Sequence, residues 1–366
     1  MATINVFHIV SGNTWSGAER YAADVMTRLR HDTRFYSEMV CGKNDAIIAQ
    51  FQHLEIPVSI LPLRGIADID SPMRLARMLK RGQNIVHAHT VKDAVTAVLA
   101  KRISENPHTR VLLTHHGMKK PRISYLHKKA LAGVDRFVSV SQTAQEAFAQ
   151  HARKVNLRKS VVIRESVLPS PAPAVPVDVR RTLRVPASQV LLIYHGRLSH
   201  DKGVGTLLRA VTQLDKSTYH LAIAGEGQPK AVKELKAFAI ANQLVGNVTF
   251  MGFQKDMQHI LAQADVSVLP STQPEALGMT CLEAMMLGLP VITTDNGAQR
   301  EYITDGRDGV LVPPGDFMRL ATEIKTLVDD ESLRRQLGRN AREAFEAHLS
   351  YDRFYRELTT LYLSLF

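Results

Sequence analysis

Cysteine and long apolar runs are the two most conspicuous shortages in this sequence of 366 residues, whose only cysteines are Cys41 and Cys281. Two cysteines are too few for a disulfide framework, and no His/Cys cluster has the spacing of a zinc site. No apolar run reaches about eighteen residues, so we expect no transmembrane helix. The N-terminus also lacks the charged and then apolar build of a signal peptide. These shortages argue against a disulfide-stabilised secreted domain and an integral membrane protein, and they predict a cytoplasmic protein.

Acidic residues are scarce in the first half of the chain. Residues 1–170 contain 25 Lys and Arg against 13 Asp and Glu, whereas residues 171–366 contain 21 against 22. No acidic residue lies between Glu105 and Asp135. The bias indicates an anionic partner, such as a membrane surface, where each basic residue contributes about 1 kcal/mol, or a phosphorylated acceptor. The residues that we expect to meet it are Lys119, Lys120, Arg122, Lys128 and Lys129.

The same basic stretch allows two alternative interpretations. A solvated basic helix face is the simplest, because most runs of charge have no further role. Nucleic acid is the second, but the chain shows no nucleic-acid-binding motif and few aromatic residues near these charges. We therefore predict peripheral contact with the inner face of the cytoplasmic membrane, or a phosphorylated acceptor, and no nucleic acid.

The length and the pattern of the chain predict two α/β domains. A chain of this length is long for one core, and short apolar strands alternate with helical segments throughout, which is typical of doubly wound layers. The run PSPAPAVP, at 169–176, can continue neither a sheet nor a helix, so it is the expected linker. We expect domains at 1–168 and 177–347, followed by a final helix at about 348–366.

Glu275 and Glu283 stand eight residues apart in the segment PEALGMTCLEAMMLGLPVI. The preceding DVSVLP predicts a buried strand, and the following residues predict a helix that Gly288 and Pro290 end. Amides at such a helix start, Gly278 to Thr280, favour an anion such as a phosphate. Eight helical residues span about 12 Å, which suits carboxylates that accept hydrogen bonds from hydroxyls on both sides of a pyrophosphate. Two solvated glutamates beside a core helix are the alternative.

Arg197 and Lys202 follow a second predicted strand, VLLIYHG, and precede a predicted helix, VGTLLRAV. In an open α/β sheet the carboxyl edge of the strands is where ligands bind. An arginine fork and a lysine point charge at that edge can hold the two phosphates of a diphosphate. Two surface cations are the alternative, which the two downstream glutamates make less attractive.

Together these motifs resemble those of the retaining, nucleotide-sugar-dependent glycosyltransferases of family 4 (group 1). The resemblance covers essentially the whole chain and implies the GT-B fold, in which two Rossmann-like domains face each other across a cleft. The final helix packs back on the first domain in that fold. The matching motifs are Gly196-Arg197, Lys202-Gly203, Gly225-Glu226-Gly227 and the pair Glu275 and Glu283.

The resemblance also assigns parts of the first half. Gly17 matches a glycine near the donor phosphates, although Ser16 replaces its usual glycine neighbour. His116 matches a histidine that lines the reaction centre near the sugar. For His87 and His115 we favour packing or strand-end hydrogen bonds, and His89 remains undecided. The segment VDRFVSVS, ending at Ser141, resembles the last strand of the first domain.

The expected function is transfer of a hexose or N-acetylhexosamine, without metal or cofactor, from a nucleotide-diphosphate sugar, most simply a UDP-sugar. The expected acceptor is a glycan or glycolipid such as lipopolysaccharide core. A nucleotide-sugar epimerase, a phosphorylase and a non-catalytic binding module are the alternatives. Catalysis is expected of His116, Glu275, Arg197 and Lys202. The donor contacts are expected from Gly17, Arg197, Lys202, Glu275, Leu277, Gly278, Met279, Thr280 and Glu283, with Leu277 standing where phenylalanine is common.

Overall fold

The computed structural model describes residues 3–12, 15, 17–65, 68–118, 125–151, 157–170 and 177–366. These residues form two compact units. The first comprises Met1–Glu165 and Phe354–Phe366, and the second comprises Ser166–Arg353. The division therefore falls three residues before the expected end of the first domain at 168, and most of the expected linker, 171–176, lies outside the described residues.

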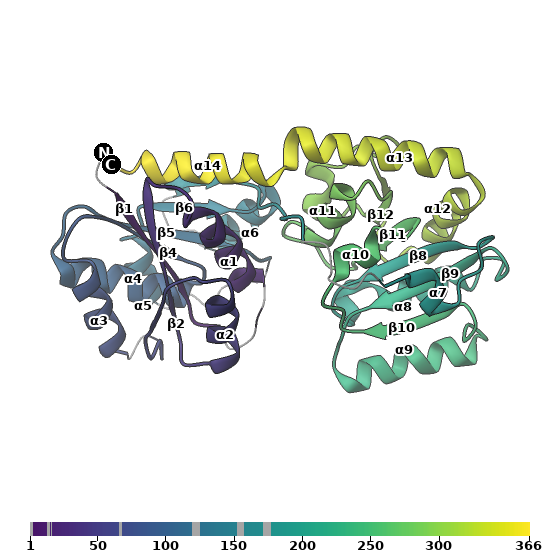
Figure 1. Ribbon diagram of the computed structural model, residues 1–366, viewed down its shortest axis with the longest axis horizontal. Helices are drawn as coiled ribbons and strands as arrows, with labels where there is room; N and C mark the ends of the chain where they lie inside the picture. The colour runs from purple at the N-terminus through teal and green to yellow at the C-terminus, as the bar shows by residue number, and fades with distance from the viewer. Residues whose placement is uncertain are drawn as a thin grey trace. The chain divides into compact units, whose positions relative to one another are not determined.

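A seven-stranded parallel sheet forms the centre of the first unit, in the order β3-β2-β1-β4-β5-β6-β7 (Figure 1). Its strands are short and rich in β-branched residues, which pack well in a sheet buried on both faces. The order reverses between β1 and β4, so the chain leaves these neighbouring strands toward opposite sides. The strands are β1 Ile4–Val10, β2 Phe35–Cys41, β3 Val58–Ile60, β4 Gln83–Ala88, β5 Thr109–His115, β6 Arg136–Ser139 and β7 Ser160–Val162.

Helices cover both faces of this sheet (Figure 1). Phe7 and Ile9 of β1 belong to the core beneath α3 and α4, whereas Val10 belongs to the core beneath α1 and α2. This alternation follows from the period of two along a strand. The helices are α1 Gly17–Leu29, α2 Asp45–His53, α3 Asp70–Met78, α4 Val91–Ser104, α5 Tyr125–Leu131, α6 Gln142–His151 and the 3-10 helix η1 Leu157–Lys159.

The expectation that VDRFVSVS is the last strand of the first unit is wrong. This segment forms β6, and β7 pairs with it in parallel as the edge of the sheet. The run Ser160–Val162 is only three residues long and follows several basic residues, so its sequence pattern is too short to predict a strand.

A six-stranded parallel sheet forms the centre of the second unit, in the order β10-β9-β8-β11-β12-β13. Its order reverses between β8 and β11, which pair directly. Such a reversal opens a crevice at the carboxyl ends of the two strands, because the following helices lie on opposite faces. The strands are β8 Val190–His195, β9 Tyr219–Ala224, β10 Val248–Gly252, β11 Val266–Leu269, β12 Val291–Thr294 and β13 Val310–Val312.

Two groups of helices pack on the second sheet. Helix α8 packs beside α9 and α12, and α11 packs beside α10 and α13 (Figure 1). These helices are α7 Val179–Leu183, α8 Val204–Val211, α9 Pro229–Ala241, α10 Met257–Leu261, α11 Met279–Met286, α12 Phe317–Asp329 and α13 Glu331–Ala344. Three short turns complete the unit: the 3-10 helices η2 His200–Lys202 and η3 Ala298–Glu301, and the π-helix η4 Phe345–Leu349.

The final helix, α14 Tyr351–Leu363, begins in the second unit and continues in the first. The hydroxyl of Tyr355 donates to Asp32 Oδ2 at 3.0 Å, and Arg110 donates to the carbonyl of Leu365 at 3.1 Å. Tyr362 is fully buried. The residues from Phe354 onward are therefore part of the core of the first unit, although they are separated from Glu165 by the whole second unit.

Candidate functional site

The residues expected to hold a diphosphate lie at the crevice of the second sheet. Arg197 and Lys202 follow β8, and Glu275 lies between β11 and α11. These two strands are the neighbours between which the strand order reverses. The structure therefore brings three of the expected residues to the ordinary ligand-binding position of an open α/β sheet.

Lys202 and Glu275 form an ion pair across this crevice. The Nζ of Lys202 lies 2.5 Å from Glu275 Oε1, and the hydroxyl of Ser271 donates to the same oxygen at 2.5 Å. The two charged side chains are 23% and 20% exposed, so they are partly shielded from water but open to a ligand. A phosphate that binds Lys202 would compete with Glu275 for the lysine ammonium. A hydroxyl of the ligand could then donate a hydrogen bond to the Glu275 carboxylate.

Gly203 explains how Lys202 comes so close to β11. It has a φ of +70°, and a Cβ at this position would lie 1.8 Å from the carbonyl oxygen of Pro270. Only glycine permits both the left-handed backbone and this close approach of the two loops. The Lys-Gly sequence is therefore a structural requirement of the pair between Lys202 and Glu275.

Arg197 leaves its charge at the surface. Its side chain is 68% exposed, and its guanidinium lies 3.5 Å from Asp201 Oδ2. The hydroxyl of Tyr194 donates to the Arg197 carbonyl at 2.7 Å and fixes the backbone at this point. An exposed ion pair of this kind contributes little to stability, so the guanidinium can exchange its carboxylate for a phosphate at small cost.

Glu283 is held by a residue that the sequence analysis did not single out, His195. The imidazole Nε2 of His195 lies 2.9 Å from Glu283 Oε2, and both side chains are buried. His195 is the last residue of β8 and Glu283 lies on α11, so the contact joins the two sides of the crevice. The apolar run VLLIYH predicts only that His195 ends a buried strand; it does not show that His195 contacts Glu283.

The loop between β11 and α11 presents backbone amides at its end. Gly278 precedes the helix with a φ of +81°, and Met279 and Thr280 begin its first turn. The first amides of a helix have no partner within the helix and favour an anion. Leu277 is buried, and its carbonyl accepts a hydrogen bond from the Tyr302 hydroxyl at 2.7 Å. This residue therefore anchors the loop to the protein interior.

A pocket of about 660 Å³ lies beside this crevice. It is lined by the loop Gly225–Gly227 after β9 and by residues of α9 and β10. The ammonium of Lys236 lies 5.7 Å from the ring centre of Phe250 on its wall. A volume of this size fits a small organic ligand, and a flat ring could pack on such apolar walls.

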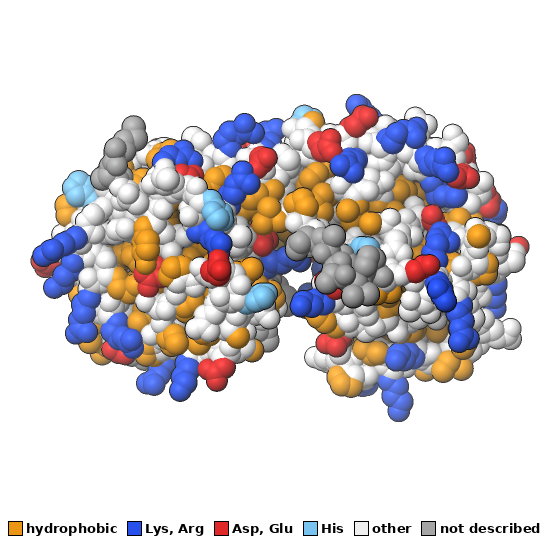
Figure 2. Space-filling model, viewed as in Figure 1, with side chains coloured by type: hydrophobic (Ala, Val, Ile, Leu, Met, Phe, Trp, Pro, Cys, Tyr) orange, Lys and Arg blue, Asp and Glu red, His pale blue; other side chains and the backbone are white. Residues whose placement is uncertain are grey.

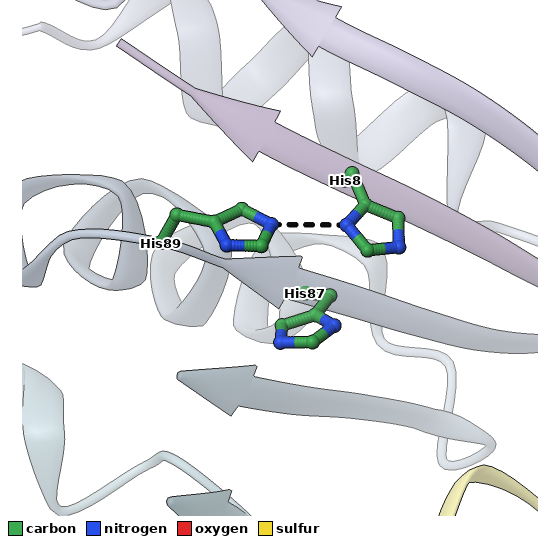
Figure 3. A group of neighbouring side chains, drawn as sticks. All are labelled: His8, His87 and His89. Atoms are coloured by element: carbon green, nitrogen blue, oxygen red, sulfur yellow. Dashed lines mark hydrogen bonds between the residues drawn. The ribbon is translucent and has the colours of Figure 1, made fainter. Parts of the chain in front are cut away.

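In the first unit, histidines gather at the carboxyl ends of β1, β4 and β5. His8, His87 and His89 are buried, and their rings lie close together (Figure 3). Burial, together with neighbouring histidines, lowers the pKa of His8 to about 3 and holds the pKa values of His87 and His89 well below their usual range. His116 follows β5, and its Nε2 lies 3.0 Å from His89 Nδ1.

One residue of this cluster, His8, was missed by the sequence analysis. Glu165 also joins the cluster, with its Oε2 3.7 Å from His116 Nδ1. In the sequence His8 is only one position of a predicted buried strand, with nothing to mark its partners. His87 was expected to pack or to make strand-end hydrogen bonds, and it does bond to Tyr362 and Thr114, both at 2.6 Å.

The remaining expected residues belong to the first unit. Gly17 is the exposed first residue of α1. Lys128 and Lys129 are exposed on α5, whereas Lys119, Lys120 and Arg122 lie outside the described residues. On the face drawn in Figure 2, Lys and Arg side chains are spread over both units. Among the helices of the described ranges, none is long and apolar enough to span a bilayer.

Two doubly wound domains, each with residues suited to ligands at the reversal of its strand order, define a protein of the GT-B class. Comparison with known proteins gives the family. Residues 178–344 match the model of the glycosyl transferases group 1, and residues 15–167 match that of glycosyltransferase family 4. The chain belongs to the group 1, family 4 glycosyltransferases, as the sequence motifs predicted.

Named relatives and solved structures agree with this assignment. EpsD of Bacillus subtilis (strain 168), which carries the name of a glycosyltransferase, is 29% identical over 76% of each chain. The lipopolysaccharide core biosynthesis glycosyltransferase LpsE of Rhizobium meliloti (strain 1021) is 32% identical over 51% of this chain and 52% of its own. The chain thus spans about half the length of LpsE and of several other curated relatives.

The predicted fold is confirmed by structures that cover nearly the whole chain. A glycosyltransferase from Rickettsia africae superposes with a TM-score of 0.87 at 19% identity, covering 99% of this chain and 98% of its own. Anabaena HepE in complex with UDP superposes with a TM-score of 0.85 at 21% identity, covering 99% and 100%. Because the sequence identities are low, these likenesses establish the GT-B fold alone.

Proposed function

We propose that this glycosyltransferase transfers a hexose or N-acetylhexosamine from a UDP-sugar to a cell-surface glycan or lipid-linked acceptor such as lipopolysaccharide core, with retention of configuration and without a metal. The observation that carries the proposal is the pair of Lys202 and Glu275 beside the first turn of α11, at the point where the strand order reverses. The names of relatives such as LpsE, and the UDP bound to HepE, support the choice of acceptor and nucleotide.

The diphosphate would lie against Arg197, Lys202 and the amides of Met279 and Thr280. Negative charge grows on the departing diphosphate as the bond to the sugar breaks, and fixed cations and amides stabilise that charge. Arg197, Lys202 and the N-terminus of α11 supply this stabilisation from the protein itself, which supports chemistry without a metal. Glu275 would accept hydrogen bonds from hydroxyls of the sugar once Lys202 binds phosphate.

Glu283 would bind the ribose, and the pocket beside Gly225–Gly227 would receive the base. The carboxylate of Glu283 is oriented by His195, so its position is set before the donor arrives. His116 of the first unit would contact the sugar near its anomeric carbon, as in the family that the chain resembles. The first unit would also bind the acceptor.

The two glutamates give the experiment that tests this assignment. Glu283→Ala should weaken the binding of free UDP, because donor and product share the ribose. Glu275→Ala should leave UDP affinity nearly unchanged and impair use of the sugar donor, because its partner is the sugar. Isothermal titration with UDP and with UDP-glucose measures both affinities, and a panel of nucleotide diphosphates identifies the base, since a ligand that binds the folded state raises the melting temperature.

A matched control is Glu323→Ala, which removes a carboxylate from a surface ion pair on α12 and should change neither titration. If Glu275→Ala and Glu283→Ala weaken UDP binding equally, the division of roles is wrong. Consumption of a UDP-sugar by the wild type in the absence of any acceptor, with formation of its epimer, would instead favour an epimerase.

The basic stretch of the first unit gives a separate prediction about the acceptor. Reversing four lysines to glutamate should abolish sedimentation with anionic liposomes and leave UDP binding intact. The attraction scales with charge near the membrane, at about 1 kcal/mol for each basic residue, and it should fade as salt shortens the screening length. The lysines to be reversed are Lys119, Lys120, Lys128 and Lys129.

The control reverses four exposed basic residues of the second unit, which changes the net charge equally but at another place. We expect this variant to keep its sedimentation. If the wild type ignores anionic liposomes at low salt, the membrane interpretation is wrong; lost transfer to an acidic glycan with an unchanged liposome profile would show that the lysines bind a phosphorylated acceptor. The control residues are Lys230, Lys325, Arg335 and Arg339.

A further inference from the structure

Four histidines and two hydroxyl groups share one face of the first sheet. The register of β1 and β4 places His8 directly opposite His87, and His89 follows two residues later. His87 in turn lies opposite Leu112 of β5, so Thr114 projects from the same face as His87. Tyr362 of α14 covers this face, and the ring of Tyr21 of α1 lies edge-on to three of the histidines. Apart from His116, the proposed function uses none of these polar groups.

Their contacts form one continuous chain that ends at His116. Starting from Thr114 Oγ1, the chain passes to His87 Nε2, from His87 Nδ1 to the hydroxyl of Tyr362, and from that hydroxyl to His8 Nε2. It continues from His8 Nδ1 to His89 Nε2, and from His89 Nδ1 to His116 Nε2. The five links, in this order, measure 2.6, 2.6, 3.4, 2.9 and 3.0 Å.

We propose that this chain donates its hydrogen bonds in one direction, from Thr114 toward His116, and thereby fixes His116 as a hydrogen-bond donor at the reaction site. The residues His8, His89 and Tyr362 are then positioning residues for His116. The inference rests on the proposed function, because that function places His116 beside the transferred sugar.

A single direction follows from the neutrality of the rings. A neutral imidazole has one N–H and one lone pair on its two nitrogens. Burial lowers the pKa values of His8, His87 and His89, so these rings are neutral at pH 7. A neutral ring that accepts on one side must donate on the other, so with His116 neutral as well the directly linked rings of His8, His89 and His116 share one polarity. The Tyr362 hydroxyl can donate once and accept twice, and when it donates to His8 the same polarity extends to His87. The chain then has two self-consistent states, which are the reverse of each other.

Glu165 decides between these two states. Its Oε2 lies 3.7 Å from His116 Nδ1, and its side chain is buried. This distance is too long for a direct hydrogen bond, but a carboxylate in a shielded position favours an N–H over a lone pair facing it. Nδ1 of His116 therefore carries the proton, and its Nε2 accepts from His89. Every ring of the chain is then in the Nδ1–H tautomer.

This state limits what His116 can do. Its lone pair on Nε2 is used by His89, so the ring can donate a hydrogen bond from Nδ1 but cannot accept a proton from an acceptor hydroxyl. The hydroxyl proton instead passes to an oxygen of the departing diphosphate, while the bond from the sugar to that diphosphate breaks and the bond from the sugar to the acceptor oxygen forms. His116 thus acts by orienting or polarising the sugar.

A metal ion is the competing interpretation of the cluster. His8, His87 and His89 can offer one nitrogen each within 4.8 Å of one another (Figure 3). A metal would need the lone pairs of these nitrogens. In the structure, hydrogen bonds already engage both nitrogens of all three rings. The contacts therefore favour the hydrogen-bond chain over metal ligation.

The direct test is nuclear magnetic resonance of the full-length protein labelled with ¹⁵N-histidine. Long-range ¹H–¹⁵N spectra distinguish the Nδ1–H tautomer, the Nε2–H tautomer and the imidazolium, and single His→Gln variants assign the signals. At pH 7 we expect His8, His87, His89 and His116 in the Nδ1–H form, with no change when Zn²⁺ is added. His115→Gln is the control, because that side chain packs near Phe148 away from the chain.

Two variants interrupt the chain at different points. Glu165→Gln removes the charge that sets the direction, and Tyr362→Phe removes the link between His87 and His8. Each should mix the tautomers of His116 and His89. Glu165→Gln should lower kcat for transfer by about tenfold with KM for the donor changed by less than about twofold, because the ring is present but carries its proton on Nδ1 in only part of the molecules. Glu165→Gln keeps the test informative if the buried change Tyr362→Phe prevents folding.

An Nε2–H tautomer or an imidazolium at His8, His89 or His116 in the wild type would overturn the proposal. One equivalent of metal in the purified protein, with metal-shifted signals from His8, His87 and His89, would also overturn it. The two proposals can fail separately. Uniform Nδ1–H signals without transfer from any UDP-sugar would contradict the proposed function and leave the chain intact, whereas transfer by a wild type with mixed tautomers would do the reverse.

Discussion

Replacing Lys202 with alanine should lower the rate of sugar transfer by about two to three orders of magnitude, and Arg197→Ala should have a loss on the same scale. In the proposed function each cation contacts the diphosphate as negative charge develops on it, so its removal would raise the energy of the transition state most. Lys202 has a second task, because it neutralises Glu275 before the donor binds. We therefore expect Lys202→Ala to weaken donor binding as well as turnover.

Steady-state kinetics with a UDP-sugar and thermal unfolding of the same samples measure these effects. The control is Lys325→Ala, which removes an exposed lysine that pairs with Asp329 on α12, far along the chain from the crevice. Neither Lys202→Ala nor Arg197→Ala should shift the melting temperature by much, because partly exposed ion pairs contribute little to stability. Rates close to wild type in both variants would remove these residues from the site.

The first unit should lose stability steeply below pH 6.5. His8, His87 and His89 have lowered pKa values in the folded protein, with His8 at about 3. Below their usual pKa of 6.5 the unfolded chain binds three protons that the folded chain does not. The free energy of unfolding therefore rises with pH and reaches its full value above pH 6.5. It falls as the pH drops toward the pKa values of these histidines in the folded protein.

One buried carboxyl group acts in the opposite sense. Burial raises the pKa of Asp93 from 3.8 to about 6, so the folded chain binds this proton first as the pH falls and gains stability between pH 6 and pH 3.8. Three histidines that exclude protons in the folded state outweigh this single carboxyl group, so the free energy of unfolding should still fall as the pH drops below 6.5.

The chain's single tryptophan allows the measurement to be made on the first unit alone. Trp15 lies with its ring centre 5.2 Å from that of Phe51, so its fluorescence reports on this unit during urea unfolding. His89→Gln should reduce the pH dependence by one proton, whereas His53→Gln, an exposed residue of α2, should not change it. A free energy of unfolding that is constant between pH 6.5 and 5 would show that the histidines are protonated in the folded state.

Much of the second unit could be predicted from the sequence because its signals are local. The strands before Arg197 and before Glu275 are short apolar runs, and glycines mark where each loop begins or ends. Parallel strands bring such loops to one edge, so the neighbourhood of Lys202 and Glu275 followed from the strand positions. The contact of His195 with Glu283 did not follow, because nothing in an apolar strand shows which helix its last residue faces.

The first unit was harder to interpret for the same physical reason. His8 and His87 lie on β1 and β4, and His116 follows β5, so the three are far apart in the sequence. Tyr362 follows His87 by 275 residues. Alternation along each strand could have placed the histidines on one face, but only the register of the sheet brings their rings into contact. The three-residue strand β7 is too short to show a period. Nothing in the sequence around Glu165 shows that its side chain faces His116.

The position of α14 has a consequence for how the protein is made. A ribosome that has finished residue 165 has produced every strand of the first sheet, yet Tyr362, which contacts His87 on one face of it, is still untranslated. Until the whole second unit has been synthesised, the histidines on that face lack the residues of α14 that cover them in the folded protein. Domains ordinarily fold in the order in which they emerge. In this protein the second unit emerges complete before α14 does, so the unit that is begun first is the one that is finished last.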